Sequence, residues 1–140
     1  MGLKKTNQLE MFGVLPSQGA DPIPVGKIPD GGTQVVVSAS PGVGTVLFYT
    51  VTAGKTLYLS LWVFSAYSEN AARQNISFFV TNAADGFQWS LFNPSILPDT
   101  VMTKTAGFMP PLEIPAGYKI KTTIDAADAP CRIFIHGYEL

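Results

Sequence analysis

The chain has 140 residues, of which 46% are hydrophobic, 11% aromatic and only 14% charged, and its formal net charge is −1. This length fits one domain, and a charged fraction below the ~25% of ordinary soluble domains favours extensive contact with other protein. A net charge near zero leaves no electrostatic footprint for nucleic acid or for an anionic membrane, so we expect neither as a partner. The single cysteine, Cys131, excludes an intramolecular disulfide.

Residues 1–32 differ in composition from the rest of the chain, because prolines and glycines alternate there with scattered apolar residues. Prolines at positions 16, 22, 24 and 29 prevent both a helix and a central strand. The apolar residues are nevertheless too numerous for a free linker. We therefore expect an extended N-terminal arm. It should dock on a surface of its own chain or on a surface of a neighbouring subunit. Its expected anchors are Phe12, Leu15, Ile23 and Ile28.

From Thr33 on, runs of β-branched and aromatic residues alternate with turn signals, a pattern that predicts strands. The strands are expected near 33–39, 45–52, 55–66, 74–82, 86–92, 100–106, 117–125 and 131–139. Eight strands at this spacing indicate an all-β fold, a two-sheet antiparallel β-sandwich of the jelly-roll type over residues 33–140. The proline-rich stretch 93–116 is expected to be a long irregular excursion around one weak strand.

The strand predicted over 55–66 has two faces of different chemistry, because side chains alternate along a strand. One face holds Leu57, Leu59, Leu61 and Val63, and the other holds Tyr58, Ser60, Trp62 and Phe64. We expect the leucine face in the core. Three aromatics on the second face indicate that another protein surface covers it, since a face in water is normally polar.

In jelly-roll strand order the strands over 55–66 and 131–139 are neighbours in one sheet. Tyr58, Trp62 and Phe64 then join Phe134, His136 and Tyr138 on one outer surface, which is the predicted interface. This assignment predicts that Trp62→Glu breaks assembly and leaves the fold intact. The tight Ala53-Gly54 turn disagrees with the order, because it suits a simple hairpin, whereas the jelly-roll connection at this place crosses between sheets.

No set of residues in the sequence predicts catalysis or metal binding. One histidine, His136, and one cysteine, Cys131, cannot supply the usual zinc ligands. Five residues apart on one strand, they face opposite sides and cannot act as a nucleophilic pair. Residues 54–56, Gly-Lys-Thr, end like a phosphate-binding loop but lack its first glycine and its following helix. We therefore expect no enzyme activity, no cofactor and no metal.

The strand and turn pattern from residue 33 on includes VTAGKTLYLSLWV, IPAGYKIKTTI and a closing RIFIHGYEL. It resembles the pattern of small virion proteins of tailed bacteriophages, and within that group the jelly-roll decoration, or cement, proteins of the capsid. The resemblance implies a non-enzymatic homo-oligomer, dimer or trimer, that binds the major capsid protein on the capsid surface and stabilises joints between its subunits. Since the start has no apolar core of signal-peptide length, we expect synthesis in the host cytoplasm.

An alternative function is the receptor- or carbohydrate-binding tip of a phage tail fibre, because such tips share this style of β-sandwich. Trp62, Trp89 and Tyr67 are the candidates for a platform on which sugars stack. This alternative requires an exposed Trp62. Capsid decoration requires instead that a partner covers the outer aromatic face.

Overall fold

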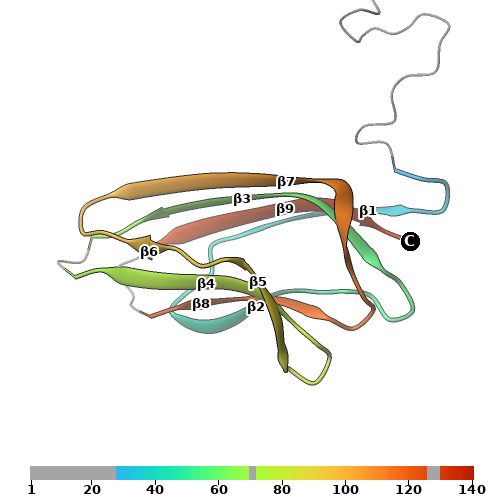
Figure 1. Cartoon of the computed structure of the whole chain (residues 1–140), viewed down its shortest axis with the longest axis horizontal. Helices are drawn as coiled ribbons and strands as arrows, with labels where there is room; N and C mark the ends of the chain where they lie inside the picture. The colour runs from blue at the N-terminus through green and yellow to red at the C-terminus, as the bar shows by residue number, and fades with distance from the viewer. Residues whose placement is uncertain (1–27, 70–71, 126–129) are drawn as a thin grey trace, which may run out of the picture.

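The computed structural model describes residues 28–69, 72–125 and 130–140, which form nine strands and no helix (Figure 1). The strands are β1 (Thr33–Ala39), β2 (Gly44–Thr50), β3 (Leu57–Tyr67), β4 (Gln74–Thr81), β5 (Phe87–Phe92), β6 (Ser95–Ile96), β7 (Val101–Ile114), β8 (Lys119–Ile124) and β9 (Cys131–Glu139). The described residues therefore contain no helix that could cross a membrane. The predicted arm anchors Phe12, Leu15 and Ile23 lie outside the described residues.

The strands form two antiparallel sheets that pack face to face as two layers (Figure 1). One sheet has the order β1-β9-β3-β7, and the other has the order β2-β8-β4-β5, with β6 paired to β4. This is the strand order of a jelly roll. The predicted all-β sandwich is confirmed, and so is the expectation that β3 and β9 are neighbours.

The tight turn after β2 does cross between the two sheets, so it does not contradict the jelly roll. On one side of the turn, Val51 exchanges hydrogen bonds with the β7–β8 turn, from its N–H to the Tyr118 carbonyl (2.9 Å) and from Gly117 N–H to its own carbonyl (3.0 Å). On the other side, Thr56 and Leu140 exchange two hydrogen bonds beside β9. The expected hairpin at Ala53-Gly54 is therefore wrong.

Strand β7 is the main difference from the predicted elements. It runs for 14 residues, whereas the sequence predicts a weak strand near 100–106 inside an irregular excursion. Proline is tolerated there because β7 is the last strand of its sheet, and one edge of its backbone needs no ladder partner. Pro110 and Pro111 therefore do not end the strand.

Between the two sheets lies a core of aliphatic and aromatic side chains. Trp62 and Phe64 of β3 contact Phe92 of β5, with ring centroids 5.2 Å apart in each pair. Trp62 also packs edge-on against Phe78 at 5.8 Å. Since these rings come from both sheets, the cluster holds the two layers together. Each large apolar side chain that is fully buried stabilises the fold by roughly 1.5–3 kcal/mol.

A β-bulge at Ser60 reverses the faces of β3 halfway along the strand. The pairing of β3 with both β7 and β9 shifts register between Leu59 and Leu61. A one-residue shift exchanges every following side chain between core and surface. Trp62 and Phe64, expected on the outer face, are therefore buried, with 2% and 0% of their surface exposed.

The same bulge moves Leu61 and Val63 to the outer side, so the expectation that they belong to the core is also wrong. Leu57 and Leu59, which precede the bulge, are buried as predicted. A second register shift lies between Val80 and Thr81, where β4 pairs with β5. It leaves Phe87 exposed on the surface, although the alternation of β5 predicts an inward side chain.

Candidate functional site

The outer face of the four-stranded sheet is the candidate site. Its central part, here called the outer apolar face, consists of Val36, Tyr58, Leu61, Val63, Phe134, His136 and Tyr138. Residues of β3 and β9 stand directly opposite each other in three rows: Tyr58 with Tyr138, Leu61 with His136, and Val63 with Phe134. Directly paired side chains on one side of a sheet are in contact. The face is therefore continuous rather than a scatter of single residues.

The first row is a stacked pair of phenol rings at one end of the face. Tyr58 and Tyr138 are nearly parallel, at 15°, with centroids 5.0 Å apart. Glu113 of β7 is the register partner of Tyr58 on its other side. Partial desolvation and the neighbouring Glu113 carboxylate raise the pKa of Tyr58. Both rings present an apolar flank and a polar tip, the combination that is enriched at protein interfaces.

His136 lies in the middle row, half-buried between two aliphatic side chains. Val36 is its partner on β1 and Leu61 its partner on β3. The Gln34 side-chain amide lies 3.2 Å from His136 Nε2. This neighbourhood orients the imidazole, and none of these three partners is a carboxylate or a thiol.

Cys131 lies on the opposite face of β9 from His136, as the alternation predicts. It is buried in the core, and burial raises the pKa of its thiol to about 11. A thiol with so high a pKa is protonated at neutral pH and is a poor nucleophile. Within the described ranges, no three His, Cys, Asp or Glu side chains converge in a way that could hold a metal ion.

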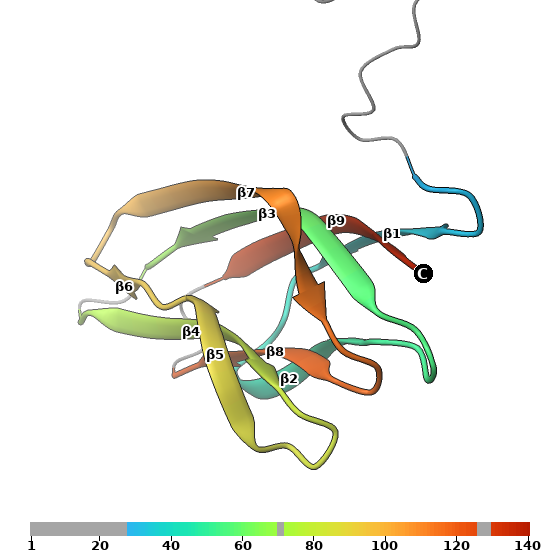
Figure 2. The same ribbon diagram turned by 45° about the vertical axis from the view of Figure 1, so that its right-hand side comes forward.

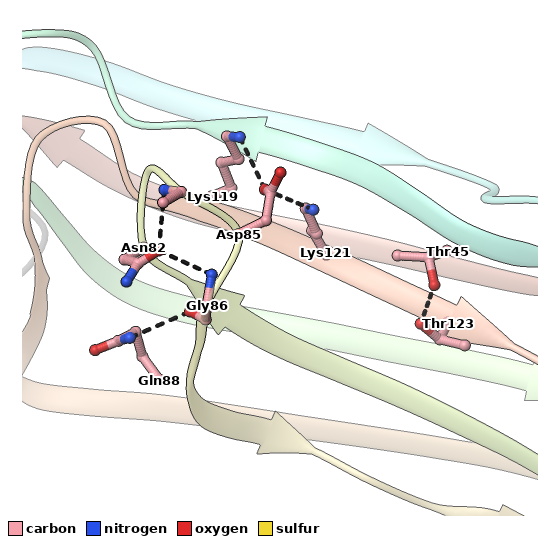
Figure 3. A network of polar contacts seen from close by, with 9 residues as sticks. Thr45, Asn82, Asp85, Gly86, Gln88, Lys119, Lys121 and Thr123 are labelled. Carbon is pink, nitrogen blue, oxygen red and sulfur yellow. Dashed lines mark hydrogen bonds and ion pairs between the residues drawn. The ribbon is translucent and has the colours of Figure 1, made fainter.

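The outer face of the five-stranded sheet has a different character (Figure 3). Asp85 of the β4–β5 turn lies 2.8 Å from both Lys119 Nζ and Lys121 Nζ of β8. These two lysines lower the pKa of the Asp85 carboxyl to about 2. Further along β8, the hydroxyls of Thr123 and Thr45 are hydrogen-bonded at 2.8 Å.

Apart from Leu47 and the Phe79–Phe87 ring pair, the centre of this second face consists of charged and hydroxyl side chains. It is suited to water, because Lys119, Lys121 and Thr123 alternate along the outer side of β8. The two broad sides therefore differ at their centres, with continuous apolar rows on one and ion pairs and hydroxyl groups on the other. Such a difference between sides is typical of a domain that contacts another protein on one side only.

Four residues of the predicted interface lie together on the outer apolar face: Tyr58, Phe134, His136 and Tyr138. Trp62 and Phe64 do not, because they are in the core. Ile28, the one arm anchor among the described residues, is half-buried at the edge of this face. Sequence reasoning missed Val36, Leu61 and Val63. The alternation of β1 places Val36 outward and was a usable signal, whereas Leu61 and Val63 depend on a bulge that no local pattern marks.

The tryptophan platform expected for a carbohydrate-binding function is wrong. Trp62 is 2% exposed and packs in the core against Phe78. Trp89 is half-buried beside Tyr118, with ring centroids 6.2 Å apart. Tyr67 is the one member of the set with an exposed side chain. The three rings therefore share no surface.

No protein-family model matches the chain, and no curated protein matches it. Among solved structures, the chain is similar to part of a chain from the crystal structure of a T13 infectious bursal disease virus particle, with a TM-score of 0.40 and 12% identity over 89% of this chain. It is also similar to chains of the Gx strain (TM-score 0.34, 14% identity, 86% covered) and the Gt strain (TM-score 0.33, 14% identity, 89% covered) of that virus. The chain spans 35–36% of the length of these solved chains, about a third.

Proposed function

We propose that this protein is a non-enzymatic structural protein of a tailed-bacteriophage virion. In this proposal it binds the outside of the capsid as a homo-oligomer, contacts the major capsid protein and stabilises the joints between capsid subunits. It is made in the host cytoplasm and carries no cofactor. The observation that carries the proposal is the continuous set of apolar rows at the centre of one broad side, whereas the centre of the other side carries ion pairs and hydroxyl groups. The resemblance of the strand and turn pattern to capsid decoration proteins supports the same assignment.

The attachment side in this proposal is the four-stranded sheet. Val36 is 53% exposed on its outer side, next to the half-buried His136. A partner that covers this side removes apolar surface from water, which stabilises the complex by about 25 cal/mol per Å². The opposite side offers ion pairs that are already satisfied within the chain, such as Asp85 with Lys119. Contact there would desolvate charges without a compensating gain.

A single copy of so small a domain is expected to bind weakly. Association costs an estimated 4–15 kcal/mol in lost freedom, and only the surplus of contact energy over this cost gives affinity. A homo-oligomer that engages several capsid subunits at once converts later contacts into intramolecular ones and gains by multivalency. Oligomerisation is therefore part of the proposed mechanism, since it turns weak individual contacts into a stable clamp across a joint.

The test compares two equally exposed aliphatic residues on opposite sides of the sandwich. Val36 lies on the outer side of β1 and is 53% exposed, and Leu47 lies on the outer side of β2 and is 54% exposed. Capsids purified from infected cells are stripped of this protein and mixed with the wild type, Val36→Glu or Leu47→Glu. The number of bound copies per particle is then measured after sedimentation. We expect Val36→Glu to reduce binding at least about tenfold, a loss of ~1.4 kcal/mol or more per site.

Leu47→Glu is expected to bind like the wild type, because its side chain faces away from the proposed attachment side. Equal loss in both variants assigns the effect to general destabilisation, and no loss in either excludes the four-stranded sheet as the attachment side. Absence of the wild-type protein from purified particles would overturn the proposed function itself.

A further inference from the structure

We infer that two copies of this chain associate through the free edge of β1, which pairs antiparallel with β1 of the second copy about a twofold axis at Val36. The two four-stranded sheets then form one continuous sheet. This inference goes beyond the proposed function, which names a homo-oligomer but no contact between its subunits. It does not depend on that function either, because every observation that supports it concerns the sandwich alone.

Strand β1 has a neighbouring strand on one side only, because it is the first strand of its sheet. Figure 2 shows β1 at one end of this sheet and β7 at the other. The open side of such a strand presents N–H and C=O groups that can pair with another strand. Addition of a strand to a sheet edge is a recurrent mode of protein recognition.

Hydrogen bonds at both ends of β9 show which of its residues bond to β3. Leu140 and Thr56 exchange two hydrogen bonds, at 3.1 and 3.0 Å. At the other end, Tyr67 N–H donates to the Pro130 carbonyl oxygen at 3.1 Å. The direction of bonding alternates along a strand, so the even-numbered residues of β9 bond to β3 and the odd-numbered residues bond to β1.

The register of β1 against β9 then identifies the free backbone groups. The odd-numbered residues of β1, such as Val35 opposite Gly137, bond to β9. The residues whose N–H and C=O groups point away from the sheet are Gln34, Val36 and Ser38. Within the described ranges, β1 pairs with β9 alone, so these groups have no partner strand.

The other three sheet edges carry features that hinder pairing. On β7, Lys104 is exposed but lies opposite the buried Phe64, so it projects from the core side of the strand. Residues 108–111 of β7, which include two prolines, have no partner on β3. Register shifts interrupt the pairing of β2 with β8 and of β5 with β4. Inward charges, prolines and bulges are the devices that protect an edge from another strand.

Strand β1 has none of these protecting features. All 7 of its residues pair with β9 without a register shift, and the sequence TQVVVSA contains no charge and no proline. Its outer side adds an apolar side chain, since Val36 is exposed there. A regular, uncharged and partly apolar edge favours pairing with another strand.

The sequence of β1 is self-complementary when two copies run antiparallel. With Val36 opposite Val36 of the second copy, Gln34 lies opposite Ser38 of the second copy. The residues of each such row exchange two backbone hydrogen bonds, because their free groups point toward the partner. On the outer side, valine contacts valine, and the Gln34 amide and the Ser38 hydroxyl match as donor and acceptor. Each copy uses the same surface, so the contact closes as a twofold dimer.

The pairing leaves the outer side of the sheet uncovered. The Val36 side chains of both copies stay on the outer side, next to the His136 row of each copy. The outer apolar faces of the two copies therefore lie side by side across the twofold axis. A dimer of this form presents one broad apolar surface instead of two separate ones.

Sedimentation equilibrium of the full-length purified protein, without capsids, tests the dimer. We expect the wild type to be mostly dimeric at ~100 µM, because small interfaces give weak association. Val36→Pro removes an N–H of the central row and should raise the dissociation constant at least about tenfold. Its fold should persist, because that N–H faces away from β9 and an edge strand tolerates proline at such a position.

Val37→Pro is the matched control, because the N–H of Val37 bonds to β9. It should lower the thermal unfolding midpoint, whereas Val36→Pro should leave the midpoint nearly unchanged. A wild type that stays monomeric at the same concentration would overturn the inference, as would a Val36→Pro chain that dimerises like the wild type. Equal losses of stability in the two proline variants would also overturn it, since the free groups would then belong to other residues.

Disulfide formation in a Cys131→Ala background tests the register. Gln34→Cys and Ser38→Cys chains are mixed in equal amounts and oxidised slowly, and the linked products are measured by mass spectrometry. The inferred row places the two α-carbons ~5.5 Å apart, within the range of a disulfide. Two Gln34→Cys chains are instead out of register by about four residues, or ~13 Å. The mixed link should therefore form at least about tenfold faster than either link between identical variants.

Val36→Cys should link to itself, and Leu47→Cys, equally exposed on β2, gives the rate of chance collisions. Links between identical Gln34→Cys chains that form as fast as the mixed link would overturn the inference. Mixed links no faster than those of Leu47→Cys would overturn it as well. These results also decide the question if Val36→Pro fails to fold. Neither experiment contains capsids, so the inference and the proposed function fail separately.

Discussion

Gly137 of β9 lies directly against the Tyr58 carbonyl oxygen of β3, at the place where β3 bulges. A Cβ at position 137 would clash with this oxygen and would come within 3.1 Å of the Leu59 Cα. The neighbours are backbone atoms of a paired strand, so they cannot give way as a flexible side chain can. The glycine therefore makes room for the bulge at Ser60, and the bulge decides which side chains of β3 enter the core.

The first prediction is that Gly137→Ala destabilises the fold. Inserting a methyl group into this contact forces the backbone of β3 or β9 to move, and overpacking of this kind typically costs about 1–3 kcal/mol. Gly42→Ala is the matched control, because no atom lies within 4 Å of its Cβ position. Urea unfolding of both variants measures the difference. Equal stability of Gly137→Ala and Gly42→Ala would show that the strands tolerate the methyl group and that the glycine is not needed for the bulge.

The second prediction concerns Trp62, which the bulge places in the core. Trp62→Glu should prevent folding, because it removes a large buried side chain, worth about 3–5 kcal/mol, and buries an unpaired charge. Trp62→Phe should fold with a smaller loss, since Trp62 Nε1 has no hydrogen-bond partner among the described residues. Circular dichroism and thermal unfolding measure both. A folded Trp62→Glu chain with normal stability would contradict the assignment of Trp62 to the core.

Much of the fold follows from patterns of a few residues. The alternation in β9 correctly separates Cys131, Ile133 and Ile135 from Phe134 and His136, because the strand is regular from end to end. Short turns with glycine at a positive φ, such as Gly54 and Gly117, mark the strand ends for the same local reason. Such features need no knowledge of the partner strand, so the sequence predicts them.

The errors arise where a strand depends on its neighbours. The faces of β3 exchange at Ser60 because of a register shift against β7 and β9, and no residue near Ser60 announces it. The same holds for Phe87, which a shift against β4 turns outward. For the candidate site, alternation alone therefore indicates five of the seven residues of the outer apolar face, all except Leu61 and Val63. The rest depended on a contact between Gly137 and Tyr58, which are far apart in sequence.

The third prediction uses the Asp85 ion pairs. Hydrogen bonds and charge attraction from Lys119 and Lys121 lower the pKa of Asp85 to about 2, from an ordinary value near 4. A carboxyl with a depressed folded-state pKa contributes stability above its unfolded pKa, and this contribution is lost as the pH falls through the folded value. Between about pH 4 and pH 2, wild-type stability should therefore fall more steeply than that of Asp85→Asn. Denaturant unfolding across this range measures the two slopes.

The control for this measurement is Asp99→Asn, which changes an aspartate that has no ion pair with any residue the structure describes. Asp99 has a φ of 51°, a conformation that asparagine also adopts readily. Its pH profile should follow the wild type. If the stability of Asp85→Asn falls as steeply with pH as that of the wild type, other carboxyl groups cause the acid sensitivity.

The fourth prediction is that the hydrogen bond between Tyr49 and Glu139 stabilises the packing of β9 against β2. Glu139 Oε1 accepts hydrogen bonds from Tyr49 Oη and from Thr52 N–H, each at 2.8 Å, and the carboxylate is buried. Burial and the Glu139 carboxylate raise the pKa of Tyr49 to about 12. Tyr49→Phe removes a bond to a charged acceptor and should cost about 1.5–3 kcal/mol. Tyr67→Phe, at an exposed position, is the control. Identical unfolding midpoints for the two variants would show that the Tyr49–Glu139 hydrogen bond does not stabilise the fold.

The fifth prediction tests whether the predicted N-terminal arm contributes to attachment. The predicted anchors Phe12 and Leu15 lie outside the described residues, and in the proposed function they bind a neighbouring subunit. Deleting residues 1–20 should leave the sandwich folded with an unchanged unfolding midpoint, because the described residues from Val35 on already form a closely packed core between the two sheets.

Binding of this shortened chain to stripped capsids should nevertheless weaken by at least about tenfold, since burying even one large apolar side chain contributes roughly 1.5–3 kcal/mol. A chain with Phe12→Ser and Leu15→Ser at full length is the matched control for the loss of chain length alone. If these two substitutions reproduce the deletion, the apolar anchors carry the contact. If the shortened chain decorates capsids as densely as the wild type at every concentration, residues 1–20 contribute nothing to attachment, and the outer side of the four-stranded sheet must account for it.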